Sequence, residues 1–237
     1  MDAMLLLLAD GRFPSGGHAH SGGLEAAVAA GRVRDLADLD AFLRGRLATT
    51  GLVAAAFAAA ACAGADLADL DHAFDARTPS PALRQASRQQ GRALLRAARS
   101  IWPIADAPKS RVPGAPGLDR RVPRPEPPEP RVPDAVELHH PVALGAVAAV
   151  AGLKPADAAL AAALGAVTGP ASAAVRLLGL DPYAVHALLA RLAPECDRIA
   201  TTAAAQDPPA DLPAAAAPLL DLSAEVHARW EVRLFAS

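Results

Sequence analysis

Long alanine-rich runs constrain the fold of this 237-residue chain more than any other feature. One run reads LVAAAFAAAACA from Leu52, and another extends from Pro155. Alanine is the best intrinsic helix former, whereas the β-branched and aromatic residues that favour strands are scarce, with aromatics at 3%. Apolar residues recur at a helical period, and no segment alternates apolar and polar residues between turn signals. The sequence predicts an all-α protein.

Local signals place several of the expected helices. Asp35 is expected to cap a helix that continues to about Cys62 and stops at Gly64. Its apolar face contains Leu36, Leu39, Leu43 and Leu47. Ser80 and Pro81 stand at the favoured first positions of a second helix. Its apolar face contains Leu83, Ala86, Leu94 and Ala97.

A long helical stretch is predicted from Pro155. Thr168, Gly169 and Pro170 interrupt its pattern, because proline removes a helix hydrogen bond and clashes one turn back. The prediction is therefore either two helices or one kinked helix. In total, a single helical-bundle-like domain over 1–237 with about eight to ten helices is expected.

Two proline clusters interrupt the helical pattern within the single expected domain. Residues 103–135 are predicted to be a proline-rich flexible loop inserted between helical halves, although a proline-rich ligand for another domain is the alternative. A second break, QDPPADLP at 206–213, precedes a C-terminal tail assigned to 221–237. The tail ends in RLFAS, and apolar residues at a chain end indicate a contact that covers them.

Bulk properties exclude several classes of partner. The net charge is −2 and the isoelectric point is about 6.4, so the basic surface that nucleic acids or anionic membranes select is not expected. The longest uninterrupted apolar runs are shorter than the ~20 residues that span a bilayer. Cys62 and Cys196 stand alone in sequence, which favours reduced, buried thiols. A cytoplasmic location follows as the expectation.

Motifs for catalysis are missing from the sequence. There is no GxxxxGK[ST] loop, HExxH, GxSxG or CxxC, and the glycines near the N-terminus do not form GxGxxG. Metal binding is the chemistry that stays open, since His18 and His20 are two residues apart and His139 and His140 are adjacent. Each pair supplies at most two ligands of about four. For His139 and His140, a helix-start pair with one ring bonded to backbone is the favoured interpretation.

The stretch PSGGHAHSGGLEA from Pro14 also has a purely structural interpretation. Its glycines suit a tight turn, His20 or Ser21 supplies an acceptor near a helix start, and Glu25 lies in the first helical turn.

The same stretch resembles the N-terminal motif of the urease accessory protein UreF family. That motif has a leucine run, a polar step, then proline, glycines, an aromatic residue, SHS and GLE. The matching positions here are Pro14, Gly16, Gly17, His20, Ser21, Gly23, Leu24 and Glu25. The sequence departs at His18, where the family commonly has phenylalanine, and at Gly22, where it often has a large apolar residue.

Four further blocks resemble the family in the same order along the chain. They contain Ser87, Gly91 and Arg92; His140, Pro141 and Gly145; Ala174, Arg176 and Leu177; and His227, Arg233, Leu234, Phe235 and Ser237. The resemblance covers nearly the whole chain except the proline-rich insert.

The resemblance implies an all-helical, non-catalytic chaperone that dimerises. Such proteins join the accessory protein UreD/UreH and the GTPase UreG to deliver nickel to apo-urease. By this resemblance Arg233, Leu234 and Phe235 contact UreD/UreH, and burying both apolar side chains there would contribute on the order of 3 kcal/mol.

Three further partner-binding candidates are His227, Glu25 and Arg176. For Glu25 and Arg176, a buried ion pair is an equal alternative. No resident cofactor is expected, and a transient nickel ion at His20 and His18 is the one metal considered. The alternative functions are a histidine-based nickel-binding protein and a helical module of another complex.

Overall fold

The computed structural model describes residues 3–102, 137–205 and 212–237. Every regular element among these residues is helical, which confirms the all-α prediction. The α-helices are α1 (Ala3–Ala9), α2 (Leu24–Ala29), α3 (Leu36–Arg46), α4 (Leu52–Cys62), α5 (Leu67–Ala76), α6 (Pro81–Ile101), α7 (His140–Val150), α8 (Pro155–Leu178), α9 (Pro182–Ala204) and α10 (Pro218–His227). A 3₁₀ turn, η1 (Gly17–Ala19), and a π-helical turn, η2 (Leu47–Gly51), complete the described elements.

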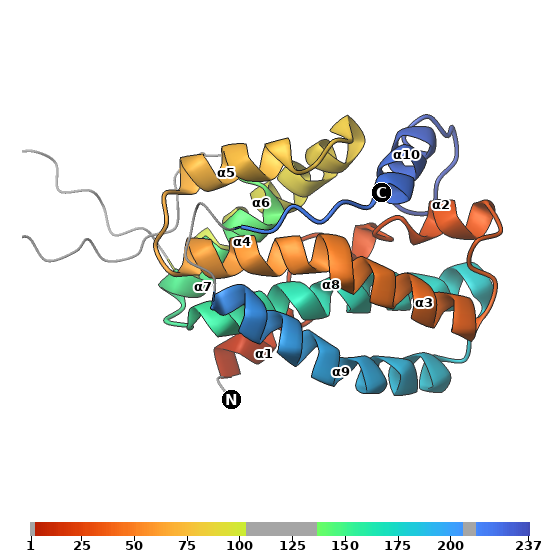
Figure 1. The fold of residues 1–237 in the computed structure, drawn as a ribbon, viewed down its shortest axis with the longest axis horizontal. Helices are drawn as coiled ribbons and strands as arrows, with labels where there is room; N and C mark the ends of the chain where they lie inside the picture. Colours follow the sequence, from red (N-terminus) through yellow and green to blue (C-terminus); the bar gives the residue numbers. More distant parts are fainter. Residues whose placement is uncertain (1–2, 103–136, 206–211) are drawn as a thin grey trace, which may run out of the picture.

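Helix α4 lies at the centre of the bundle and packs against α7, α8 and α9 (Figure 1). Its residues from Ala55 to Ala61 are all buried, so the helix is covered on every side. Small side chains allow close approach: a Cβ atom at Gly145 of α7 would overlap the carbonyl oxygen of Ala58 in α4. Alanine therefore acts here as a spacer as well as a helix former.

The predicted helix starts are confirmed. Asp35 accepts hydrogen bonds from the amides of Ala37 and Asp38, and Ser80 accepts one from the amide of Leu83. Helix α3 passes into α4 through η2 without leaving helical geometry, and Gly64, with φ at +92°, follows the end of α4.

Proline does not break α8, which runs without interruption through Pro170. Of the two predicted outcomes, one helix is therefore the correct one. Pro170 cannot donate to the carbonyl of Ala166 four residues earlier. The Arg46 side chain supplies that hydrogen bond instead, through Nε at 2.9 Å.

Two continuous helical stretches, Leu36–Cys62 and Pro155–Leu178, are long and apolar enough to cross a membrane by length and composition. The expectation based on short apolar runs is therefore incomplete, because the helices extend past the runs. Just over half of each apolar window is buried inside the bundle, where α4 and α8 pack on one another. Core helices of water-soluble bundles meet the same criterion.

The predicted flexible loop at 103–135 lies outside the described residues, as do residues 206–211 of the second proline cluster. Past that cluster, residues 212–217 run without regular structure towards α10, and Arg77 donates to the carbonyls of Leu212 and Pro213. The tail boundary expected at residue 221 falls within α10, so the segment without regular structure is 228–237.

Candidate functional site

Glu25 joins the two ends of the chain. It lies in the first turn of α2, beside α10 (Figure 1), and only 8% of it is exposed. Its carboxylate pairs with His227 Nε2 at 2.8 Å and accepts hydrogen bonds from the amides of Leu234 at 2.7 Å and Phe235 at 3.0 Å. One buried carboxylate thus binds α10 and the segment that follows it.

These donors determine the charge state of Glu25. Burial alone would raise the pKa of Glu25, but hydrogen bonds from the Leu234 amide, the His227 ring and the Phe235 amide together lower it below its ordinary value. The carboxylate is therefore ionised at neutral pH, as an acceptor for three donors must be.

Ser21 and His20 bind the last residue of the chain. The carbonyl oxygen of Ser237 accepts from the amide of Ser21 at 2.6 Å and from its hydroxyl at 2.9 Å, while His20 Nδ1 lies 2.7 Å from the Ser237 hydroxyl. The Ala236 amide also donates to the carbonyl of Ala19 at 2.7 Å. We call the contacts of residues 19–25 with His227 and residues 234–237 the tail clasp.

Two glycines shape the turn that carries the tail clasp. Gly22 and Gly23 both have left-handed backbones, with φ at +61° and +89°. A Cβ at Gly23 would overlap the end of the Leu220 side chain of α10, so a side chain there would require Leu220 to move. The turn predicted from the glycines therefore also packs against α10.

Helix α10 has two further attachments. Glu225 accepts hydrogen bonds from the Ser80 hydroxyl and the Ala82 amide at the start of α6. Arg32 donates to the hydroxyl of Ser223 at 2.8 Å. The helix is thereby attached to the start of α6 and to the segment that follows α2.

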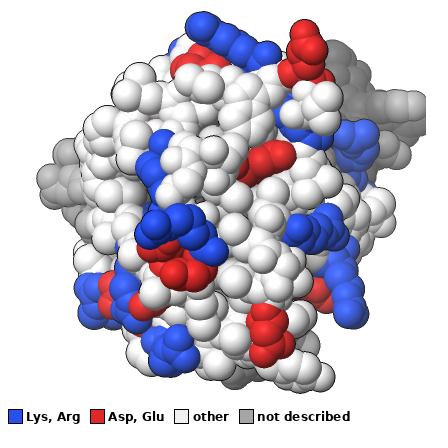
Figure 2. All heavy atoms as spheres, turned by 90° about the vertical axis from the view of Figure 1, so that its right-hand side faces the viewer, with Lys and Arg blue, Asp and Glu red and all other residues white. Residues whose placement is uncertain are grey.

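The outer side of α10 is apolar and uncovered. Leu219, Leu222 and Val226 follow a helical spacing and are 57%, 67% and 58% exposed. A shallow groove of about 330 Å³ runs beside them between α2 and α10, with Trp230 at its wall. Figure 2 views this end of the molecule: positive and negative side chains are scattered over it, with uncharged surface between them and no patch of one sign.

The tail residues predicted for partner binding differ in exposure. Leu234 is 61% exposed, and Arg233 is exposed as well. Phe235 instead belongs to the hydrophobic core of this chain. Phe235 is thus already covered by its own chain, which leaves Leu234 as the apolar side chain of the tail that a partner could bury. The partner-binding role of the tail stays a prediction.

Of the other three candidates, Glu25 and His227 lie together and Arg176 lies apart from them. Glu25 forms the buried pair with His227 that is one of its two predicted alternatives. Arg176 is exposed near the end of α8 and takes no part in the tail clasp, so the buried ion pair considered for it is not formed.

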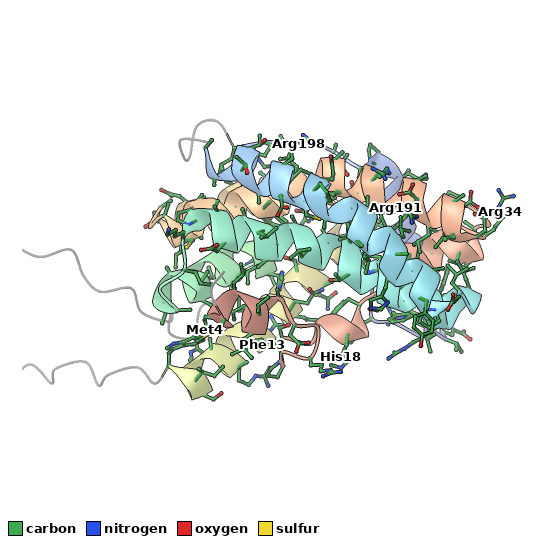
Figure 3. All side chains as sticks on the ribbon, turned by 90° about the horizontal axis from the view of Figure 1, so that it is seen from below. Met4, Phe13, His18, Arg34, Arg191 and Arg198 are labelled. Carbon is green, nitrogen blue, oxygen red and sulfur yellow. The ribbon has the colours of Figure 1, made fainter. Side chains whose placement is uncertain are left out.

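The four histidines considered for metal binding do not form a ligand set. Among the described residues no group of three or more His, Cys, Asp or Glu side chains could hold a metal ion. His18 is exposed at the edge of the molecule (Figure 3), while His20 is partly buried and bonded to Ser237. His139 Nε2 pairs with Asp75 at 3.0 Å, so the partner of this ring is a carboxylate, whereas a backbone partner was predicted for one ring of the pair.

The rings of His20 and His140 nevertheless interact electrostatically. Burial, and then the charge of His20, lower the pKa of His140 to about 4. Burial, and then the charge of His18, lower the pKa of His20. His20 and His140 belong to segments that are distant in sequence. The rings of both residues are neutral at neutral pH.

Sequence reasoning missed Arg46, Glu225 and the part that Ser21 plays as a tail ligand. Arg46 and Glu225 lie in ordinary helical segments, where an isolated charged residue carries no signal of its distant partner. The sequence predicts Ser21 only as a local acceptor, a role that it has for the Glu25 amide at 3.2 Å.

Comparison with known proteins identifies the family. The sequence model of the UreF family matches residues 33–193. The chain is 48% identical over 235 residues to a urease accessory protein UreF of Mycobacterium sp. (strain JLS), covering 98% of this chain and 97% of the relative. It is 46% identical over 237 residues to that of Mycobacterium marinum and 43% to that of Mycobacterium tuberculosis, each time covering 99% of this chain and 98% of the relative.

The names of these relatives describe accessory proteins and not enzymes, in agreement with the non-enzymatic prediction. The match extends beyond residues 33–193 to both ends of the chain, where the tail clasp lies. This chain belongs to the UreF family of urease accessory proteins.

Proposed function

We propose that this chain is a scaffold for nickel delivery to apo-urease and that it docks the accessory protein UreD/UreH on α10 and the clasped tail. The observation that carries this proposal is the uncovered apolar side of α10, held in place by buried Glu25. Exposed apolar residues at helical spacing on an otherwise charge-mixed face are typical of a protein-binding surface. Leu234 extends that surface along the tail.

The proposed scaffold also dimerises and binds the GTPase UreG in the cytoplasm, coupling GTP hydrolysis to nickel insertion. Family membership and the absence of a catalytic motif in the sequence support this part. Arg176, exposed near the end of α8, is available to a protein partner away from the tail clasp. No nucleic acid or membrane partner is proposed.

Co-purification with UreD/UreH tests the docking surface. Leu219→Asp should weaken capture by at least tenfold, since it places a charge in the apolar contact. The carboxylate is compatible with the helix because it stands in the first turn of α10. Leu6→Asp is the matched control, because Leu6 is 58% exposed on α1, away from α10 (Figure 1).

Equal capture by both variants would refute docking on α10. Deleting residues 233–237 tests the tail in the same assay, and unchanged complex formation would remove the tail from the interface. Light scattering of the purified chain checks the dimer, and capture of UreG by the chain with and without UreD/UreH checks the bridge.

Direct nickel binding is a second candidate, favoured by the electrostatic interaction between His20 and His140. Two neutral imidazoles are ligands of a kind that nickel accepts. Titration calorimetry with nickel would show a site that His20→Ala abolishes. Unchanged weak binding in that variant would leave the scaffold function alone.

A further inference from the structure

Arg46 connects the tail clasp to the core of the bundle. It is the last residue of α3, and its guanidinium reaches two carbonyl oxygens. Nη1 donates to Gly22 at 2.8 Å, and Nε donates to Ala166 at 2.9 Å. One side chain thus spans the turn of the tail clasp and the middle of α8.

The Ala166 carbonyl is free to accept this bond because of Pro170. In an α-helix the amide four residues later would donate to it, and proline has no amide hydrogen. The missing donor in α8 creates the acceptor that Arg46 uses. Proline at this position therefore serves a contact outside its own helix.

The other side of the guanidinium lies against Gly22. A Cβ built on Gly22 would stand 3.0 Å from Cγ of Pro170 and 3.1 Å from Cζ of Arg46, closer than ordinary van der Waals contact. The backbone of the turn therefore rests directly on the proline ring and the guanidinium plane. A side chain at residue 22 would need this space.

The backbone of Arg46, from which this side chain extends, is also held in place. The π-helical turn η2 begins at the next residue, and the Thr49 and Thr50 hydroxyls both lie within hydrogen-bond distance of the Arg46 carbonyl. Burial lowers the pKa of Arg46 to about 10, so the side chain remains charged at neutral pH. None of its hydrogen bonds to described residues goes to a carboxylate.

Arg46 is partly buried, and a partly buried charge costs free energy unless it is hydrogen-bonded. An apolar side chain of similar length would fill the same space but could not donate hydrogen bonds to the two carbonyl oxygens. Packing alone therefore does not explain an arginine at this position.

We propose that Arg46 is the positioning residue of the tail clasp. It holds the Gly22–Gly23 turn against α8 at the one place where Ser21 and Glu25 meet the tail. Loss of the guanidinium frees the turn, and the contacts of residues 234–237 loosen with it. The inference about geometry concerns the isolated chain; its consequence for UreD/UreH docking rests on the proposed function.

Hydrogen exchange of the tail amides measures this role. In the clasp the amides of Leu234, Phe235 and Ala236 are all hydrogen-bonded. Arg46→Met should accelerate their exchange at least tenfold relative to amides in the middle of α9. Arg46→Lys keeps the charge but cannot span both carbonyls in the same way, so its exchange should be intermediate.

Pro170→Ala separates positioning from stability. Alanine returns the amide that α8 lacks, which satisfies Ala166 from within the helix, and removes the ring on which Gly22 rests. The urea midpoint should hold or rise, whereas the tail amides should exchange about threefold faster. If Arg46 only stabilised the fold, the urea midpoint and the exchange rate of the tail amides would change together. Gly169→Ala is the matched control, because a Cβ there meets nothing within 4 Å.

Unchanged tail exchange in Arg46→Met and Pro170→Ala would overturn the proposal. If Arg46→Met fails to fold, Arg46→Lys and Pro170→Ala decide on the same measurement. Faster tail exchange with undiminished UreD/UreH capture would instead refute the docking role of the tail, and the positioning role of Arg46 would stand.

Discussion

The tail clasp and the start of α7 both bring distant segments together around carboxylates, but they distribute the contacts differently. In the tail clasp one buried carboxylate, Glu25, receives three donors. At the start of α7, Asp71 and Asp75 of α5 share Arg84, Arg88 and His139. We call this second group, together with Glu137 and Leu138, the α7 anchor.

The two sites also differ in how deeply their carboxylates Glu25 and Asp75 are buried. Glu25 is almost fully buried, whereas 40% of the Asp75 side chain is exposed. Water can replace a lost partner of Asp75 but not of Glu25. A site with single, buried contacts is expected to fail as a unit, and a site with shared, exposed contacts to weaken gradually.

Replacing Glu25 should give the largest effect. Glu25→Ala leaves His227 and two tail amides without an acceptor in a buried site, which costs about 3 kcal/mol unless the tail detaches into water and limits the loss. Urea unfolding and hydrogen exchange of residues 234–236 measure both outcomes. Glu231→Ala, at an exposed residue of the same segment, is the control and should change neither. A stable variant with a protected tail would show that Glu25 does not hold the clasp.

Gly91→Ala should give the next largest effect and breaks the α7 anchor by sterics. A Cβ at Gly91 would overlap the carbonyl oxygen of Leu138, and backbone can move away only by displacing the start of α7. We expect a loss of about 2 kcal/mol in urea unfolding. Gly165→Ala, in open space within α8, should instead stabilise by roughly 0.5 kcal/mol. A similar gain at Gly91 would contradict the close approach.

Acid should release the tail clasp. The pKa of Glu25 is lowered on folding from its ordinary value of 4.5, so its stabilisation is complete above that value and is lost as the pH falls through the lowered folded pKa. Tail amides should therefore lose their extra protection in this acid range. Glu25→Gln should remove this pH dependence, and an unchanged profile in the variant would assign it to another group.

Asp75 provides the corresponding test in the α7 anchor. Burial would raise the pKa of Asp75, but hydrogen bonds from His139 and Arg88, with the charge of Arg84, lower it below 3.8. Its stabilisation is likewise lost as the pH falls through the folded pKa. Asp75→Asn should change the acid profile of the α7 anchor and leave the tail amides unaffected.

Single charge deletions in the α7 anchor should give the smallest effects. Arg88→Ala should cost about 1 kcal/mol, because Asp71 and Asp75 keep His139 and Arg84 as partners. Arg92→Ala removes only the half-exposed pair with Glu137 and should stay within roughly 0.5 kcal/mol. Urea midpoints at neutral pH measure both. A loss at Arg88 as large as that at Glu25 would remove the distinction between the two sites.

The family motifs acquire physical roles from this comparison. Gly91 and Gly145 permit close approaches of backbone, Gly22 and Gly23 shape the turn, and Glu25 holds the tail. The sequence resemblance includes most of these residues but assigns Glu25 a partner-binding role, which stays a prediction. The structure adds that Glu25 has three partners within its own chain.

Local chemistry determines where the helices of this chain form and begin. Alanine propensity and the caps at Asp35 and Ser80 act over a few residues, so the sequence alone predicts them correctly. The same local rules leave two helices open at Pro170, because they count a lost hydrogen bond and do not include a donor 120 residues away from Ala166 in sequence.

Only the tertiary structure decided which ends of the chain meet and which hydrogen bonds form between them. Alanine faces are nearly alike, so their pattern does not specify which helices pack together, and a carboxylate such as Glu25 gives no sign of whether its donors lie in a partner or in its own chain. Those choices depend on where the backbone places Arg46, Glu25 and the tail in space. The sequence therefore determined a bundle of helices and its family, and packing determined that the bundle holds its own tail.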